Sequence, residues 1–128
     1  MKRKTGVFVV THGSRLKEAN WIMFRLTREL RRRLRTDCIV PCFMELGQPD
    51  IPTAIRRLIK RGCNHIFGYA FFLVPGKHLQ RDIPHIVKET LKDHPGVTFE
   101  LSEPMMADPA LTDFVESRLK RELRSPAH

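Results

Sequence analysis

Apolar residues follow two different periods along this chain. Short runs of consecutive apolar residues, such as Val7–Val10, alternate with longer stretches in which apolar residues recur every three or four positions. The runs are typical of strands covered on both faces, and the stretches are typical of amphipathic helices. The strands are expected at about residues 7–11, 38–44, 65–73 and 97–101. The helices are expected at about residues 16–35, 51–61, 79–94 and 109–119. This order predicts an α/β fold with a doubly wound, mostly parallel four-stranded sheet and helices on both faces.

Prolines and acidic residues set the expected element boundaries. Pro41 interrupts the second apolar run, and because a strand proline is tolerated mainly at a sheet edge, this strand is expected there. The third run is the most apolar and is expected in the centre of the sheet. Asp50 and Asp108 each precede a helical stretch with a proline in its first turn, which predicts that both are N-caps. Pro84 is tolerated only near a helix start, which predicts that the third helix begins at about residues 79–82.

A length of 128 residues suits one domain, expected over residues 1–124 with a frayed tail at 125–128. No apolar run is as long as a membrane span, and Met1–Lys4 leads directly into the first strand rather than into a signal peptide. We therefore expect a soluble, cytoplasmic protein with no membrane partner.

The three cysteines, Cys38, Cys42 and Cys63, include no CxxC pair, which argues against both a disulfide framework and a thiolate zinc site. In an extended strand Cys38 and Cys42 would lie about 13 Å apart, too far to share one metal. All three are expected to be buried thiols that fill the core.

The net charge of +9 indicates an acidic partner, which could be nucleic acid, an anionic membrane surface or a small polyanion. Charge alone does not choose among them. The polar face of the first helix carries a row of arginines, namely Arg25, Arg28, Arg31, Arg32, Arg33 and Arg35. We interpret them as a solvated surface, because a single-strand binder would interleave aromatic residues among them. Trp21 and Phe24 lie off the apolar stripe of this helix, and they either widen its buried face or form a subunit contact.

His12, Glu45 and His78 each follow one of the first three strands. The carboxyl ends of parallel strands meet at one edge of a sheet, where open α/β folds bind ligands, so these side chains are expected to converge. Two imidazoles and a carboxylate suit a divalent first-row metal with open coordination positions. After the first strand, Gly13 permits a sharp turn and Ser14 is expected to cap the following helix.

Polar and basic residues surround the two histidines at the starts of helices, whose N-terminal dipoles favour anions. The rim residues are Ser14, Arg15, Lys77 and Arg81. A metal site with a basic rim suits a polycarboxylate that itself takes up a metal. The other histidines are interpreted as packed or solvated residues, namely His65, His85, His94 and His128.

Four motifs resemble, in order and spacing, the short sirohydrochlorin chelatases of the CbiX type, and the match covers nearly the whole chain. They are His12-Gly13-Ser14-Arg15, Phe43-Met44-Glu45-Leu46, Pro49-Asp50-Ile51-Pro52, and the segment from Phe72 to His78 followed by Arg81-Asp82-Ile83-Pro84. The resemblance implies a single domain of flavodoxin-like topology that inserts cobalt, iron or sometimes nickel into sirohydrochlorin. It also implies that the enzyme uses neither ATP nor an organic cofactor and serves cobalamin or sirohaem biosynthesis. The short form would work as a homodimer whose copies replace the two lobes of longer chelatases.

By this resemblance His12 and His78 bind the metal and accept protons, and Glu45 is the accompanying carboxylate. The divalent metal, Co2+, Fe2+ or Ni2+, is a substrate, and the rim residues are expected to contact the carboxylates of sirohydrochlorin. The segment Met105–Pro109 departs from the relatives, which often carry a glycine and a histidine before this proline.

Two other functions fit parts of the pattern. One is a non-catalytic carrier of a metal or tetrapyrrole on the same fold, and the other is a basic nucleic-acid-binding module that uses the Arg25–Arg35 face. Neither explains why three strand ends carry compatible ligands. The enzyme is therefore favoured, and no nucleic-acid partner is expected.

Overall fold

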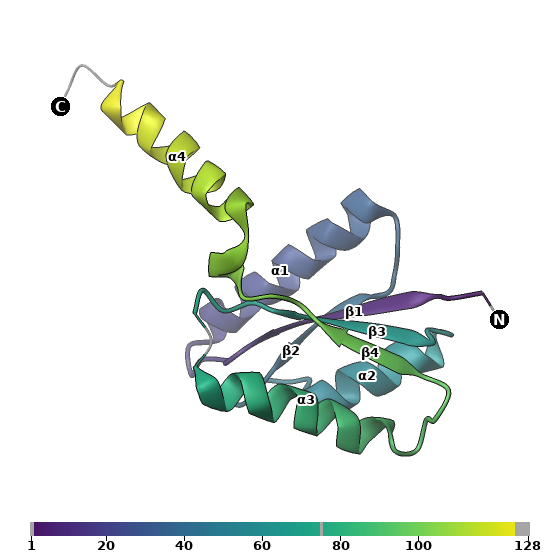
Figure 1. The fold of residues 1–128 in the computed structure, drawn as a ribbon. Coiled ribbons are helices and arrows are strands. Elements are labelled where there is room, and N and C mark those ends of the chain that lie inside the picture. Colours follow the sequence, from purple (N-terminus) through teal and green to yellow (C-terminus); the bar gives the residue numbers. More distant parts are fainter. Residues whose placement is uncertain (1, 75, 125–128) are drawn as a thin grey trace.

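The computed structural model describes residues 2–74 and 76–124, which form a four-stranded sheet with helices around it (Figure 1). The strands are β1 (Thr5–Thr11), β2 (Ile39–Phe43), β3 (His65–Ala70) and β4 (Thr98–Leu101). The helices are α1 (Lys17–Leu34), α2 (Ile51–Lys60), α3 (Lys77–Leu91), the short 3-10 helix η1 (Met105–Ala107) and α4 (Pro109–Leu123). The sheet order is β2-β1-β3-β4, and each neighbouring pair is parallel. The predicted doubly wound parallel sheet is confirmed.

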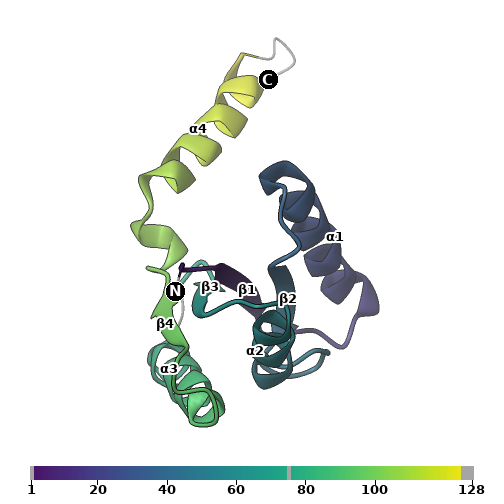
Figure 2. The same ribbon diagram turned by 90° about the vertical axis from the view of Figure 1, so that its right-hand side faces the viewer.

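Helices lie on both faces of the sheet, as Figure 2 shows, and a cluster of buried side chains packs on each face. On one face, Phe8 of β1 and Ile66 of β3 share a core cluster with Ile55 of α2. On the other face, Met23 of α1 packs in a second cluster with Phe43 of β2. Each fully buried side chain of this size contributes about 1.5–3 kcal/mol relative to an exposed one. Because side chains pack against β1 and β2 on both faces of the sheet, the carboxyl ends of these two strands are held in fixed positions.

The order of the strands confirms two expectations. β2, which contains Pro41, lies at the sheet edge, where Pro41 is paired in register with Val9. An edge position tolerates a proline because its missing N–H leaves no outer neighbour unpaired. β3 lies inside the sheet between β1 and β4, as its apolar sequence predicted.

Both predicted aspartate N-caps are confirmed. The Asp50 carboxylate accepts a hydrogen bond from the Thr53 backbone N–H at 2.9 Å. Hydrogen bonding to Thr53, through its side chain first and its backbone N–H second, lowers the pKa of Asp50 below its usual range. The Asp108 carboxylate accepts one from the Ala110 backbone N–H at 2.9 Å. Each cap satisfies a backbone donor that the first turn of a helix leaves free.

The predicted start of the third helix is wrong. α3 begins at Lys77, so Pro84 lies inside the helix rather than in its first turn. A proline in a helix interior costs about 3 kcal/mol through a lost hydrogen bond and a steric clash. Ile83 and Val87, on either side of Pro84, are both buried in the core, and their burial offsets that cost.

α4 is the exception to the layered arrangement. It lies on the same side of the sheet as α1 but projects away from the body, and none of its residues is buried (Figures 1 and 2). The β3–β4 half of that sheet face therefore has no helix packed over it among the described residues. The tail expected to fray, 125–128, lies outside the described residues.

The expectation that the cysteines are buried is confirmed for Cys38, Cys42 and Cys63. Burial, followed by a hydrogen bond with Cys38, raises the pKa of the Cys63 thiol to about 12. A thiol with so high a pKa stays protonated and unreactive near neutral pH. In the described part of the chain, none of the helices is long and apolar enough to cross a membrane.

Candidate active site at the carboxyl ends of the strands

His12 and Glu45 lie side by side where β1 and β2 end. The two backbone segments stay hydrogen-bonded to each other past the strands. The Met44 N–H donates to the Thr11 carbonyl at 2.9 Å, and the Glu45 N–H donates to the His12 carbonyl at 3.0 Å. The His12 Nδ1 atom lies 3.9 Å from the Glu45 Oε1 atom, and the two side chains are 56% and 67% exposed. The backbone therefore brings a titratable base and a carboxylate together in an accessible position.

Gly13 makes this approach possible. Its φ is +97°, and a Cβ atom at this position would lie only 1.9 Å from the Glu45 backbone oxygen. A side chain is excluded for two reasons, the left-handed backbone and the contact with a carbonyl that cannot move without moving Glu45. The sharp turn predicted at Gly13 is confirmed.

Asn20 of α1 joins the loop after β1 to the loop after β2. Its Oδ1 atom accepts from the Ser14 N–H at 2.8 Å, and its Nδ2 group donates to the Ser14 carbonyl at 2.9 Å and to the Leu46 carbonyl at 2.8 Å. One half-buried amide thus fixes the segments on both sides of the His12–Glu45 pair. The sequence analysis missed it, although Asn20 falls three residues before the buried Met23, on the face of the helix that meets the sheet.

The predicted capping role of Ser14 is wrong. α1 begins at Lys17 after Leu16, whose side chain makes no capping hydrogen bond. The Ser14 Oγ atom accepts from the Leu16 N–H at 3.1 Å and so closes a turn before the helix. Because Asn20 holds both the N–H and the carbonyl of Ser14, this residue is kept outside the helix.

Phe72, from the loop after β3, is a second neighbour that the sequence analysis missed. Its ring meets the His12 imidazole edge to face, with ring centroids 5.7 Å apart. Such a contact limits rotation of the imidazole and shields one side of it from water. The loop after β3 therefore contributes to the site through an aromatic ring.

His78 is the second residue of α3, at the same edge of the sheet. An Arg81 guanidinium nitrogen lies 3.0 Å from the His78 Nδ1 atom. Since a guanidinium only donates, Nδ1 is the acceptor and the neutral ring carries its proton on Nε2. Metal binding through Nδ1 requires Arg81 to move away.

The three expected metal ligands are not gathered into one cluster. Within residues 2–74 and 76–124, no three His, Cys, Asp or Glu side chains are close enough to hold a metal ion together. His12 and Glu45 follow their strands almost directly, whereas His78 comes eight residues after β3 ends at Ala70. The chain length between β3 and α3 explains why two of the three residues are adjacent and the third is not.

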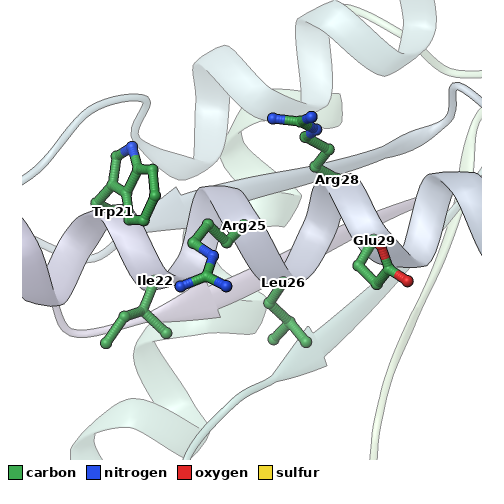
Figure 3. A pocket seen from close by; sticks show the side chains of 6 residues that line it. All are labelled: Trp21, Ile22, Arg25, Leu26, Arg28 and Glu29. Atoms are coloured by element: carbon green, nitrogen blue, oxygen red, sulfur yellow. The ribbon is translucent and has the colours of Figure 1, made fainter.

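The basic rim residues Arg15, Lys77 and Arg81 are all exposed, and the Arg81 Nε atom lies 3.9 Å from the Asp82 carboxylate. A separate open hollow of about 510 Å³ lies on α1 and is lined by Trp21, Ile22, Arg25, Leu26, Arg28 and Glu29 (Figure 3). None of these lining residues belongs to the strand-end site. This hollow is a surface feature of α1.

The sequence profile of the CbiX family matches residues 6–122. The chain belongs to the CbiX family. The matched region contains all of the strand-end residues described above, so the resemblance expected from the four motifs is confirmed.

Three relatives illustrate the range of the family. The chain is 28% identical over 115 residues to the chloroplastic sirohydrochlorin ferrochelatase of Arabidopsis thaliana, which covers 90% of this chain and 51% of the relative. It is 30% identical over 120 residues to the sirohydrochlorin cobaltochelatase of Sulfurisphaera tokodaii, covering 94% and 95%. The solved structure of SirB from Bacillus subtilis with Fe3+ superposes with a TM-score of 0.82 at 25% identity, covering 96% of this chain and 48% of SirB. The chain thus spans about half the length of the plant and Bacillus relatives.

Proposed function

We propose that this chain catalyses the ATP-independent insertion of a divalent metal into sirohydrochlorin, with Co2+ or Fe2+ as the metal and Ni2+ as a third candidate. Membership in the CbiX family and the names of the relatives support this proposal. The single observation that carries it is the accessible His12–Glu45 pair at the carboxyl edge of the sheet, with 3.9 Å between Nδ1 and Oε1. This edge is where open α/β sheets bind their ligands.

The pair suits the proton balance of the reaction. Insertion replaces both pyrrole N–H protons of the macrocycle with one divalent ion, so the site must take up two protons for each metal that it delivers. A neutral His12 imidazole accepts a proton from the macrocycle, and Glu45 passes it on toward solvent. Because both side chains are more than half exposed, protons leave the site through water.

The metal is a substrate and must leave the protein, so weak and incomplete coordination is an advantage. His12 and Glu45 supply one nitrogen and one oxygen ligand, which several first-row divalent ions accept. His78 completes the temporary shell once its hydrogen bond with Arg81 is released and the start of α3 moves toward the pair. Two adjacent ligands and one movable ligand fit an ion that is bound briefly and then transferred.

The rim orients the macrocycle. Arg15, Lys77 and Arg81 are exposed cations near the strand-end edge, and Ser14 lies in the turn between His12 and α1. Charge-assisted hydrogen bonds from arginines to carboxylates are stronger than neutral ones. The carboxylates of sirohydrochlorin are therefore held by this rim with the ring facing His12.

The active form is a homodimer. The chain spans 48% of SirB and 51% of the plant ferrochelatase, so two copies match one long relative in length. A single copy presents an open edge to the macrocycle. A second copy closes that edge from the other side.

The test is absorbance-monitored insertion into sirohydrochlorin with Co2+, Fe2+ and Ni2+ in separate reactions. Wild-type protein is expected to accelerate insertion over buffer with at least one ion, His12→Ala is expected to abolish the acceleration while the protein stays folded, and His85→Ala serves as the matched control on exposed α3 surface. Binding of metal or sirohydrochlorin without acceleration by the wild type would overturn the proposal in favour of a carrier.

A further inference from the structure

The last helix has an apolar line with nothing packed on it. Leu111, Val115, Leu119 and Leu123 recur every four residues along α4, and an open hollow of about 580 Å³ follows this line. The Leu123 side chain is 83% exposed, and no α4 residue is buried. A 15-residue helix without packing is marginal in water, because most helix stability in proteins comes from a buried apolar face. α4 therefore needs a surface to cover its apolar line.

The same chain has a vacant surface of the right kind. On the α1 side of the sheet, Phe67 and Tyr69 of β3 and Glu100 of β4 line an open hollow of about 710 Å³. η1 and the start of α4 line one side of this hollow, and no other described helix packs over this half of the sheet (Figure 2). Leu26 of α1 and Tyr69 of β3 pack against the same core cluster, and Ile22 lies on the same side of α1 as Leu26 (Figure 3). We call these residues of β3, β4 and α1 the open strip.

The segment before α4 directs the helix away from its own open strip. The Met106 N–H donates to the Leu73 carbonyl at 3.3 Å, which ties η1 to the loop after β3. The Asp108 N–H donates to the Met105 carbonyl at 3.1 Å, and the Asp108 carboxylate caps α4. These bonds set the direction in which α4 leaves the body. The helix projects past the strip of its own chain (Figure 1).

We propose that two copies of this chain exchange α4, so that the apolar line of each α4 packs on the open strip of the other copy. The proposal rests on the homodimer proposed above and specifies how it is built. Each copy has one uncovered helix and one uncovered strip, and a two-fold exchange buries both pairs in a closed dimer. Charge supports this pairing. Glu100 in the strip and Arg118, seven residues after Leu111 on α4, both lack an ion pair among the described residues.

The exchange also has a consequence for the strand-end site. η1 and the start of α4 follow β4 at the carboxyl edge of the sheet, the edge that carries His12 and Glu45. Exchanged helices therefore fix the orientation of the two active edges relative to each other. The macrocycle would bind between edges that the two α4 helices hold in register.

Cysteine cross-linking tests the exchange directly. One tagged chain carries Glu100→Cys. A second chain, with a tag of different size, carries Leu111→Cys, Val115→Cys or Leu119→Cys. The two chains are co-expressed and then oxidised. At least one position is expected to give a disulfide-linked heterodimer on a non-reducing gel. Ser117→Cys, on the opposite side of α4, is expected to give none. The native cysteines are buried, and wild-type protein serves as their control.

The double variants, with both cysteines in one chain, distinguish exchange from folding back. Exchange gives covalent dimers, whereas an α4 that packs on its own strip gives monomers with an internal disulfide. Internal disulfides alone, or no disulfide at any of the three positions, would overturn the proposal. By light scattering, Leu119→Glu is expected to halve the molar mass, and the matched Ser117→Glu is expected to keep the dimer.

The insertion assay on the same preparations separates this proposal from the proposed function. Interchain cross-links in protein that does not accelerate metal insertion would support the exchange and overturn the function. Internal cross-links in fully active protein would overturn the exchange and leave the function in place.

Discussion

A Cβ atom at Gly13 would lie 1.9 Å from the backbone oxygen of Glu45. This distance links the backbone after β1 to the position of the catalytic carboxylate proposed after β2. The glycine therefore determines whether the His12 and Glu45 side chains can meet.

Gly13→Ala is expected to separate the two loops. The left-handed backbone at this position costs a non-glycine residue about 1–2 kcal/mol, and the contact with the Glu45 carbonyl adds to that. We expect a lower melting temperature and a metal-insertion rate reduced by at least tenfold, measured by thermal unfolding and by absorbance. Gly96→Ala is the control, since a Cβ atom there has no neighbour within 4 Å. A Gly13→Ala variant with wild-type turnover would contradict this reading of the site.

Asn20→Ala is expected to loosen both loops at once. It removes three hydrogen bonds to Ser14 and Leu46, which at a half-buried position corresponds to about 1–3 kcal/mol of unfolding free energy. Because Asn20 acts by positioning His12 and Glu45, kcat should fall by about tenfold while the KM for sirohydrochlorin changes little.

The matched control for Asn20 is Glu18→Ala, an exposed change in the first turn of the same helix. Urea unfolding measures stability, and steady-state kinetics separates kcat from KM. A variant that loses stability but keeps the wild-type kcat would reduce Asn20 to a purely structural role.

The fold could be predicted because its signals are local. An unbroken apolar run marks β1, and an aspartate before a proline marks the start of α2 and of α4, whatever packs against them. The position of β2 at the edge follows from Pro41 alone. The predictions made from Pro84 and Ser14 are wrong because tertiary contacts outweigh the local preferences of these residues. The buried side chains on either side of Pro84 stabilise α3 despite the proline. The hydrogen bonds of Asn20 hold Ser14 outside α1.

The site was predictable in part. His12 and Glu45 follow neighbouring parallel strands within one or two residues, so strand pairing alone brings them together. Asn20 bonds to the Ser14 and Leu46 backbones beside the pair, and the Phe72 ring contacts His12. These contacts depend on how α1 and the loop after β3 pack, which the period of apolar residues does not predict. The projection of α4 away from the body was likewise not predictable. Its amphipathic sequence would be the same whether its apolar line packed on its own sheet or on another surface.

The cap at Asp50 predicts a pH dependence of stability. Hydrogen bonds from the side chain and then the backbone N–H of Thr53 hold the pKa of Asp50 below its ordinary value of 3.8. A depressed acid pKa stabilises the folded state above the ordinary value, and this stabilisation is lost as the pH falls through the folded-state pKa. Asp50→Ala is expected to cost about 1 kcal/mol of unfolding free energy at neutral pH.

Asp50→Asn provides the control for that pH dependence. Asparagine caps helices as well as aspartate does, but it does not titrate. Denaturant unfolding at a series of pH values should show a difference between wild type and Asp50→Ala that shrinks below about pH 4, while the difference between Asp50→Asn and Asp50→Ala stays constant. If the stability difference between wild type and Asp50→Ala does not change with pH, the carboxylate charge contributes nothing to the cap.

Glu45→Gln tests the proton relay separately from the geometry. The amide keeps the size of the side chain and its contact with His12 but cannot accept a proton. If Glu45 carries protons away from His12, kcat should fall by about 10²–10⁴-fold, the usual contribution of general acid–base catalysis, while the KM for sirohydrochlorin stays within about twofold. Stopped-flow absorbance with Co2+ measures the insertion step, and Glu18→Gln is the control for loss of one exposed carboxylate. A Glu45→Gln variant that raises the KM for metal at unchanged kcat would instead make Glu45 a metal ligand with no part in proton transfer.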